Sequence, residues 1–198
     1  MSKIKTVGIV GTGVIGTGWI IRNLAHNKIV HAYDQNKNLK NYVLKEIKRT
    51  SKSIKKLFGK KILIKNLKFF NSLEKALSNV DFVQESVLEN YKVKTDLIQK
   101  ISKYVKSNVI ISSSSSGLLP SKIFSKSKNP QRGIIGHPFN PAYLLPAVEI
   151  VPGKKTTRKF LSDANKYYKS ISMRPIMLKK ELPGYLSDRL QEALWREG

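Results

Sequence analysis

The chain has three histidines and no cysteine, so thiolate chemistry and disulfides are excluded. His26 and His31 lie at the end of a predicted helix and in a predicted strand, where we expect structural roles. His137 differs, because it ends an apolar run and a Pro-Phe-Asn-Pro break follows it directly. Open α/β sheets bind ligands beyond the carboxyl ends of their strands. An imidazole there could transfer a proton near neutral pH, although a lone histidine is also compatible with a structural role.

A glycine-rich turn near the N-terminus could bind phosphate groups. It follows an apolar run, opens a segment compatible with a helix, and consists of Gly11, Thr12, Gly13, Val14, Ile15 and Gly16. Gly11 would allow the tight turn, Gly13 the close approach of a pyrophosphate, and Gly16 the close packing of helix on sheet. Free N–H groups at the helix start would bind the phosphates. The pattern predicts a dinucleotide site; the alternative is a strand–turn–helix with incidental glycines.

Asp34 indicates which dinucleotide binds. It ends the next apolar run, 18 residues after Gly16, where an acid can accept hydrogen bonds from the adenosine ribose. Its charge would repel a 2′-phosphate, and no arginine follows in Gln35-Asn36-Lys37. We therefore expect NAD rather than NADP as the cofactor.

Apolar runs of strand length alternate along the chain with segments of helical period. We expect strands over residues 3–10, 29–33, 62–64, 67–70, 81–85, 109–112, 132–137, 147–151 and 175–179, and helices over residues 14–26, 36–56, 73–77, 91–104, 120–124, 157–170 and 185–197. Ser72 and Thr156 would cap two helices, and Gly59 would end a third. This alternation is typical of an α/β fold with a doubly wound, mostly parallel, Rossmann-like sheet.

The last helix, over residues 185–197, has an apolar face that nothing else in the chain would cover. We therefore expect two parts: a cofactor domain, residues 1–182, and the first helix of a C-terminal helical domain, residues 183–198, apparently truncated. A homodimer through the missing domain is the expected assembly. The alternatives are a helix that packs back on the sheet or against a second subunit.

The net charge of +24 could indicate a polyanionic partner such as nucleic acid. However, lysines outnumber arginines about four to one, whereas base readout and bidentate phosphate binding favour arginine. We interpret most lysines as a solvated surface, so nucleic acid is not the expected partner. No segment is apolar enough to span a membrane, and no cleavage site for a signal peptide is apparent, so we expect a cytoplasmic protein.

Six motifs in order along the chain resemble those of the 3-hydroxyacyl-CoA dehydrogenase family. They are the glycine turn, Val83-Gln84-Glu85, the serine run 112–116, Gly136-His137-Pro138-Phe139-Asn140-Pro141, Val148-Glu149-Ile150-Val151 and Lys180-Glu181-Leu182-Pro183-Gly184-Tyr185. The match covers nearly the whole chain. The resemblance implies an NAD-binding domain and the oxidation of a 3-hydroxyl group by hydride transfer.

The resemblance also implies roles for individual residues. His137 matches the catalytic base of the family, and Glu149, twelve residues later, matches the acid that orients it. Ser116, 21 residues before His137, matches a serine that hydrogen-bonds the reacting oxygen and lies at the cofactor. Glu89, Lys94 and Asn140 match further cofactor contacts. No metal is expected.

One departure concerns the substrate. Acyl-CoA members carry Asn before the Arg-Leu pair of the final helix, where this chain has Asp188. Trp195, seven residues further on, would share its helical face, and a carboxylate with an indole suits a trimethylammonium group. The serine turn and the final helix are most similar to the branch that oxidises the 3-hydroxyl of L-carnitine to 3-dehydrocarnitine. Alternatively, Trp195 is a core or interface residue.

Other functions stay open from the sequence. A short-chain 3-hydroxyacyl-CoA dehydrogenase and an L-gulonate 3-dehydrogenase or λ-crystallin-like protein would share the motifs. A basic binding protein that keeps the fold without turnover is the alternative outside the enzymes. The His137 and Glu149 pair favours an NAD-dependent 3-hydroxy acid dehydrogenase with a small, carnitine-like substrate.

Overall fold

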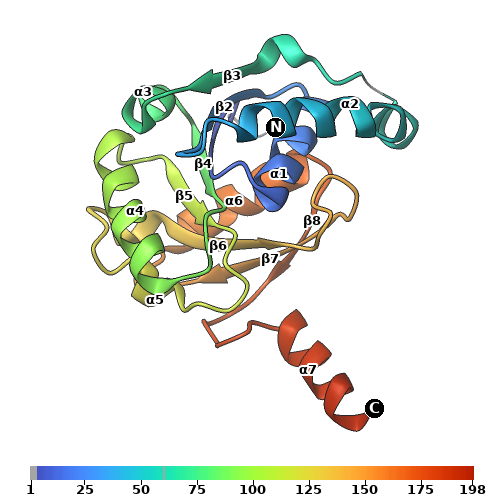
Figure 1. The fold of residues 1–198 in the computed structure, drawn as a ribbon. Helices are drawn as coiled ribbons and strands as arrows, with labels where there is room; N and C mark the ends of the chain where they lie inside the picture. Colours follow the sequence, from blue (N-terminus) through green and yellow to red (C-terminus); the bar gives the residue numbers. More distant parts are fainter. Residues whose placement is uncertain (1–3, 60) are drawn as a thin grey trace.

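The apolar runs form one eight-stranded sheet in the computed structural model, which describes residues 4–59 and 61–198 (Figure 1). The strand order is β3-β2-β1-β4-β5-β6-β7-β8. The strands are β1 Thr6–Val10, β2 Ile29–Tyr33, β3 Leu67–Phe70, β4 Phe82–Glu85, β5 Ile110–Ser113, β6 Gly133–Pro138, β7 Ala147–Pro152 and β8 Arg174–Met177. All neighbouring strands pair in parallel except β6 and β7, which are antiparallel. The expected doubly wound, mostly parallel sheet is confirmed.

The antiparallel pair has a local cause. Residues 139–146, between β6 and β7, contain no helix, so the chain turns back and β7 runs beside β6 in the opposite direction. The start of β7 therefore lies against the end of β6, and the register places Glu149 opposite His137. A parallel β7 would need a crossover and would carry Glu149 away from this edge.

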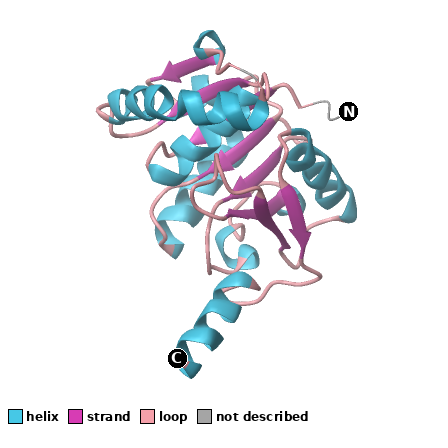
Figure 2. Cartoon of the chain, turned by 90° about the vertical axis from the view of Figure 1, so that its right-hand side faces the viewer, coloured by secondary structure: helices cyan, strands magenta, loops and turns pink. Residues whose placement is uncertain are grey.

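Helices cover both faces of the sheet. They are α1 Val14–Ala25, α2 Leu39–Phe58, α3 Leu73–Leu77, α4 Tyr91–Tyr104, α5 Pro120–Ile123, α6 Arg158–Ser170 and α7 Ser187–Glu197, with 3₁₀ turns at Ile64–Asn66 and Pro130–Arg132. One apolar core includes Ile47 of α2 and Tyr168 of α6, and the other includes Ile98 of α4 and Ile123 of α5. Figures 1 and 2 both show α7 projecting away from the sheet. No helix in the described ranges is long and apolar enough to cross a membrane.

Two expectations near α2 need correction. Residues 62–64 form no strand, because the chain there approaches the 3₁₀ turn Ile64–Asn66 that leads into β3. Helix α2 begins at Leu39 rather than residue 36, because Asp34 Oδ1 accepts the Asn36 N–H (2.9 Å) and Asn36 Oδ1 accepts the Asn38 N–H (3.1 Å). These contacts hold residues 34–38 as a turn. Gly59 ends α2 in the left-handed conformation, as predicted.

Other boundaries shift by one to a few residues. Thr156 does not cap α6, because its hydroxyl accepts the Gly153 N–H and donates to Gly133 O; Thr157 is the N-cap residue. Helix α7 begins at Ser187 rather than residue 185, since Tyr185 has a left-handed φ of 46°. Lys3, where the first strand was expected to begin, lies outside the described residues.

Candidate active site and cofactor cleft

The glycine turn after β1 has the geometry of a phosphate-binding turn. Gly11 has a φ of +87°, and a Cβ there would lie 2.7 Å from Ser86 O, so only glycine fits. A Cβ on Gly13 would meet nothing within 4 Å, so the turn faces open space there. Gly13 is the N-cap residue of α1 and has no side-chain cap, which leaves the first N–H groups of α1 available to an anion.

Gly16 and Thr12 act differently from expectation. A Cβ on Gly16 would lie 1.8 Å from Gly11 O, so Gly16 is needed for packing against the turn itself, more than against the sheet. The Thr12 N–H and hydroxyl both donate to Asp34 Oδ2, at 2.6 and 3.2 Å. Thr12 is buried and holds the acid in place, and so it offers no free donor from these groups to a cofactor.

Two hollows lie along the carboxyl ends of the strands. The first, of about 860 Å³, is lined by Gly11, Gly13 and Asp34 at the glycine turn. The second, of about 800 Å³, lies beyond β4, β5 and β6 and is lined by these predicted site residues: Ile15, Glu89, Lys94, Ser116, His137, Asn140, Glu149 and Asp188. Ser86 and Val87 line both hollows, so they form one cleft at the position where open α/β sheets bind dinucleotides. Val14, in contrast, is 59% exposed and lines neither hollow.

His137 and Glu149 meet in the second hollow. His137 Nδ1 lies 2.8 Å from Glu149 Oε2. The Leu186 and Ser187 N–H groups donate to Glu149 Oε1, both at 3.0 Å, and the Ser187 hydroxyl donates to Oε2 at 2.7 Å. Burial alone would raise the pKa of Glu149, but the hydrogen bonds from His137, Ser187 and the Leu186 amide outweigh burial and hold that pKa below its usual value.

The contact with Glu149 determines the tautomer of the neutral His137 imidazole. An ionised carboxylate only accepts hydrogen bonds, so the proton of neutral His137 must sit on Nδ1. Its Nε2 then carries a lone pair, and Nε2 has no hydrogen bond to any described residue. The geometry therefore provides a proton acceptor that lines the cleft and a buried anion that stabilises its protonated form.

The serines at residues 112–116 differ in whether their hydroxyl groups have a hydrogen-bond partner among the described residues. Ser112 bonds Tyr168, Ser113 donates to Glu85, Ser114 bonds three side chains, and Ser115 donates to Glu89. Ser116 lines the second hollow, and its hydroxyl makes no hydrogen bond within the described part of the chain; only its N–H is used, by Glu89 at 3.0 Å. Ser116 is therefore the serine of the run whose hydroxyl stays available at the hollow among the described residues.

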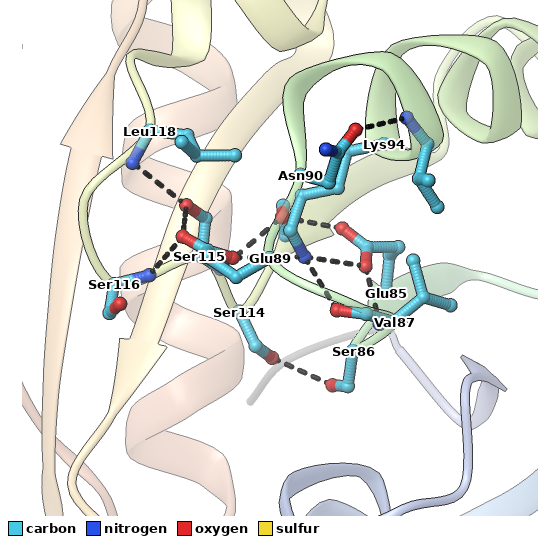
Figure 3. Close-up of polar contacts among 12 residues, drawn as sticks. Glu85, Ser86, Val87, Glu89, Asn90, Lys94, Ser114, Ser115, Ser116 and Leu118 are labelled. Atoms are coloured by element: carbon cyan, nitrogen blue, oxygen red, sulfur yellow. Dashed lines mark hydrogen bonds and ion pairs between the residues drawn. The ribbon is translucent and has the colours of Figure 1, made fainter.

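Lys94 and Glu89 have protein partners of their own, as Figure 3 shows. Lys94 is 1% exposed, and its Nζ lies 2.8 Å from Glu85 Oε1, 3.4 Å from Glu89 Oε2 and 3.0 Å from Val87 O. Glu89 Oε1 accepts the N–H groups of Ser116 and Gly117. The ammonium of Lys94 is fully used in fixing the two acids, so the pair shapes the cleft wall by holding the serine turn.

These observations place the chain among known proteins. Residues 6–182 match the family described as "3-hydroxyacyl-CoA dehydrogenase, NAD binding domain". The chain belongs to this family. Its cofactor is therefore NAD. The uncapped helix start, the open space at Gly13 and the acid at the end of β2 fit this cofactor.

Several curated relatives of the chain share a name. The chain is 42% identical over 195 residues to an L-carnitine dehydrogenase of Oceanobacillus iheyensis, a match that covers 98% of this chain and 64% of the relative. It is 42% identical over 198 residues to one of Pseudomonas putida, covering 100% of this chain and 62% of that relative. The chain thus spans less than two thirds of the length of these relatives.

Solved structures share the fold. An NAD⁺-dependent dismutase, 5-formyl-3-hydroxy-2-methylpyridine 4-carboxylic acid 5-dehydrogenase, matches with a TM-score of 0.90 at 26% identity, over 98% of this chain and 63% of that one. A 3-hydroxybutyryl-CoA dehydrogenase of Escherichia coli also has a TM-score of 0.90, at 23% identity, over 98% and 42% of the two chains. The sheet and its helices are those of this dehydrogenase fold.

Some residues of the final helix, α7, line the second hollow and others do not. Asp188 lines the second hollow; burial raises the pKa of its carboxyl group, while nearby His137 opposes that rise. Trp195 is 70% exposed and does not line the hollow; Gln191 and Leu194 of α7 do. The structure therefore does not bring the predicted indole beside Asp188 at the cleft, and it excludes a place for Trp195 in the described core.

Sequence reasoning assigned no role to three residues that organise the site. Ser187 binds Glu149, and Glu85 is the fully buried acid beneath Lys94. Buried Arg22 of α1 donates to Ala142 O (3.0 Å) and Leu145 O (2.9 Å), which ties the segment after Asn140 to the cofactor helix. A charged residue in an otherwise apolar segment was the available signal for Glu85 and Arg22, whereas nothing local marks Ser187.

Proposed function

We propose that this chain is the cofactor-binding part of an NAD-dependent dehydrogenase that oxidises the 3-hydroxyl of L-carnitine to 3-dehydrocarnitine. The observation that carries the proposal is the His137–Glu149 pair, which lines the same cleft as the glycine turn. The relatives named L-carnitine dehydrogenase, 38–42% identical to this chain, support the choice of substrate.

The residues divide the chemistry between them. NAD supplies the hydride acceptor when bound. His137 Nε2 takes the proton of the substrate hydroxyl, and the Glu149 carboxylate stabilises the imidazolium that results. The unused Ser116 hydroxyl and the Asn140 amide, both at the hollow, hydrogen-bond the oxygen as it changes from alcohol to ketone. General-base assistance of this kind is worth about 10²–10⁴ in rate.

Asp188 gives the site a charge suited to this substrate. Its half-buried carboxylate lies in the hollow that His137 lines and can attract the trimethylammonium group. Phe139 lines the same hollow and offers an aromatic surface to that cation. Trp195 is exposed and does not line the hollow, so we assign it no role in substrate binding.

The proposal extends to the organisation of the protein. Residues 1–182 are the NAD-binding domain, and residues 183–198 begin a helical domain whose partner surface is the apolar side of α7, where Leu190 and Leu194 are exposed. A homodimer and a cytoplasmic location belong to the same proposal.

The test is NADH formation by the purified complete protein, helical domain included, with L-carnitine, D-carnitine, L-gulonate and 3-hydroxybutyryl-CoA. L-Carnitine should give the highest kcat/KM, and D-carnitine should give none, because its hydroxyl has the opposite configuration. Faster turnover of gulonate or of the CoA ester would contradict the substrate assignment. Binding of NAD without turnover of any of the four would contradict the proposed activity.

A further inference from the structure

A hydrogen-bond network, which we call the Ser114 network, lies in the wall of the second hollow, which Ser114 and Ser86 both line. Ser114 Oγ is its centre and has three partners: Trp19 Nε1 at 3.1 Å, Gln84 Nε2 at 2.8 Å and Ser86 Oγ at 2.8 Å. Figure 3 shows the contact between Ser114 and Ser86. Trp19 and Gln84 are buried, whereas Ser114 and Ser86 are partly buried, so the two donors to Ser114 are held from the protein side.

The donors and acceptors of the network can be assigned from chemistry. An indole N–H only donates. The Gln84 amide is oriented by its surroundings, because its Nε2 also donates to the carbonyl Gly136 O (3.3 Å) and its Oε1 accepts the Tyr168 hydroxyl proton (2.7 Å). Ser114 Oγ therefore accepts two hydrogen bonds, which uses both of its lone pairs. Its own proton must go to Ser86 Oγ.

The direction of the hydrogen bond between Ser114 and Ser86 determines what the Ser86 hydroxyl can still do. Its oxygen accepts from Ser114 and has no other partner among the residues that the structure describes, so its own proton is free to donate. The Ser86 N–H binds Val10 O at 2.8 Å, and Ser86 O limits the space at Gly11, so the residue is held directly beside the glycine turn. It also lines both hollows of the cleft.

We propose that Ser86 is a further cofactor-binding residue, whose hydroxyl donates a hydrogen bond to an oxygen of NAD where the two hollows join. The inference rests on the proposed function and deepens it. The ligand that must span the two hollows is the dinucleotide, whose phosphate and ribose oxygens accept hydrogen bonds. Trp19 and Gln84 are positioning residues, since they act on the ligand only by forcing the Ser114 proton toward Ser86.

The first experiment measures the Kd of NAD by calorimetry for the wild-type protein and for Ser86→Ala. Loss of one hydrogen bond should weaken binding about three- to tenfold. Ser107→Ala, an exposed serine between α4 and β5 at the other end of the sheet, should keep the wild-type Kd. Equal Kd values for wild type and Ser86→Ala would overturn the inference alone, whereas a wild-type protein that binds no NAD would overturn the cofactor assignment as well.

The second experiment tests the direction of the network. Trp19→Phe removes one of the two N–H groups that donate to Ser114 Oγ, which frees a lone pair on that oxygen. The Ser86 hydroxyl can then donate its proton to Ser114 and not to the cofactor. NAD binding should then weaken about two- to threefold, but only where residue 86 is serine. Trp19→Phe should have no effect on Kd in the Ser86→Ala background, with melting temperatures recorded to confirm folding. An equal change in the Kd of NAD with Ser86 and with Ser86→Ala would overturn the assigned direction of the hydrogen bond from Ser114 to Ser86.

Discussion

Two buried acids stand at the same edge of the sheet, each with a basic partner, and they do different work. Glu149 at the start of β7 holds His137, and Glu85 at the end of β4 holds Lys94. His137 keeps Nε2 unused at the hollow, whereas the ammonium of Lys94 is used by Glu85, Glu89 and Val87 O. The hydrogen-bonding capacity left over after folding, more than residue type, therefore decides which group can act on a ligand.

Replacement of His137 should change activity more than any other substitution considered. His137→Gln removes the lone pair that takes the proton in the proposed reaction, so NADH formation from L-carnitine should fall about 10²- to 10⁴-fold. The Kd of NAD and the melting temperature should change little, because Gln can still donate to Glu149. Turnover within a few-fold of wild type would show that His137 is not the proton acceptor.

Lys94→Met removes the cation of the buried Lys94–Glu85 pair. It leaves Glu85 fully buried without its cation, and the free energy of unfolding should fall by about 3–5 kcal/mol in urea denaturation. The matched control is Lys92→Met on the same helix, because the side chain of Lys92 is 88% exposed and pairs with Asp96 at the surface. That change should cost under about 1 kcal/mol. Equal costs for the two variants would contradict the contrast.

Asp188→Asn changes an acid that lines the second hollow and has no basic side chain at ion-pair distance in the described structure. We expect kcat/KM for L-carnitine to fall about tenfold, equivalent to about 1.4 kcal/mol. The value for 3-hydroxybutyrate, which lacks the cation, should stay near wild type. Equal losses for both substrates would assign Asp188 a structural role.

The smallest effect is a dependence of stability on pH. The pKa of Glu149 is lower in the folded protein than its ordinary value of 4.5, so the unfolded chain binds more protons as pH falls. Its contribution is complete above about pH 4.5 and is lost as pH drops through the folded-state pKa. The free energy of unfolding should therefore fall in acid less steeply for Glu149→Gln than for wild type. Parallel curves would contradict the lowered pKa.

Local patterns were enough to predict most of the fold. Strand β2 and helices α3 and α4 have the predicted bounds, because apolar periodicity and the capping side chains of Ser72 and Asn90 act within a few residues. The late starts of α2 and α7 were missed for a physical reason. At α2 a chain of side-chain contacts from Asp34 competes with the helix, and before α7 the Leu186 and Ser187 amides bind distant Glu149.

Residue type and spacing were enough to predict the glycine turn, the acid at the end of β2 and the cofactor, and the family resemblance added the candidate pair His137 and Glu149, because these signals are local in the sequence. The packing of distant segments sets which of the predicted groups stay available to a ligand. It buried Lys94 between two acids, turned Thr12 toward Asp34 and left Trp195 outside the cleft. The physical reason is that a donor or acceptor satisfied by one neighbour is lost to another, and the neighbours are set by how distant strands and helices pack.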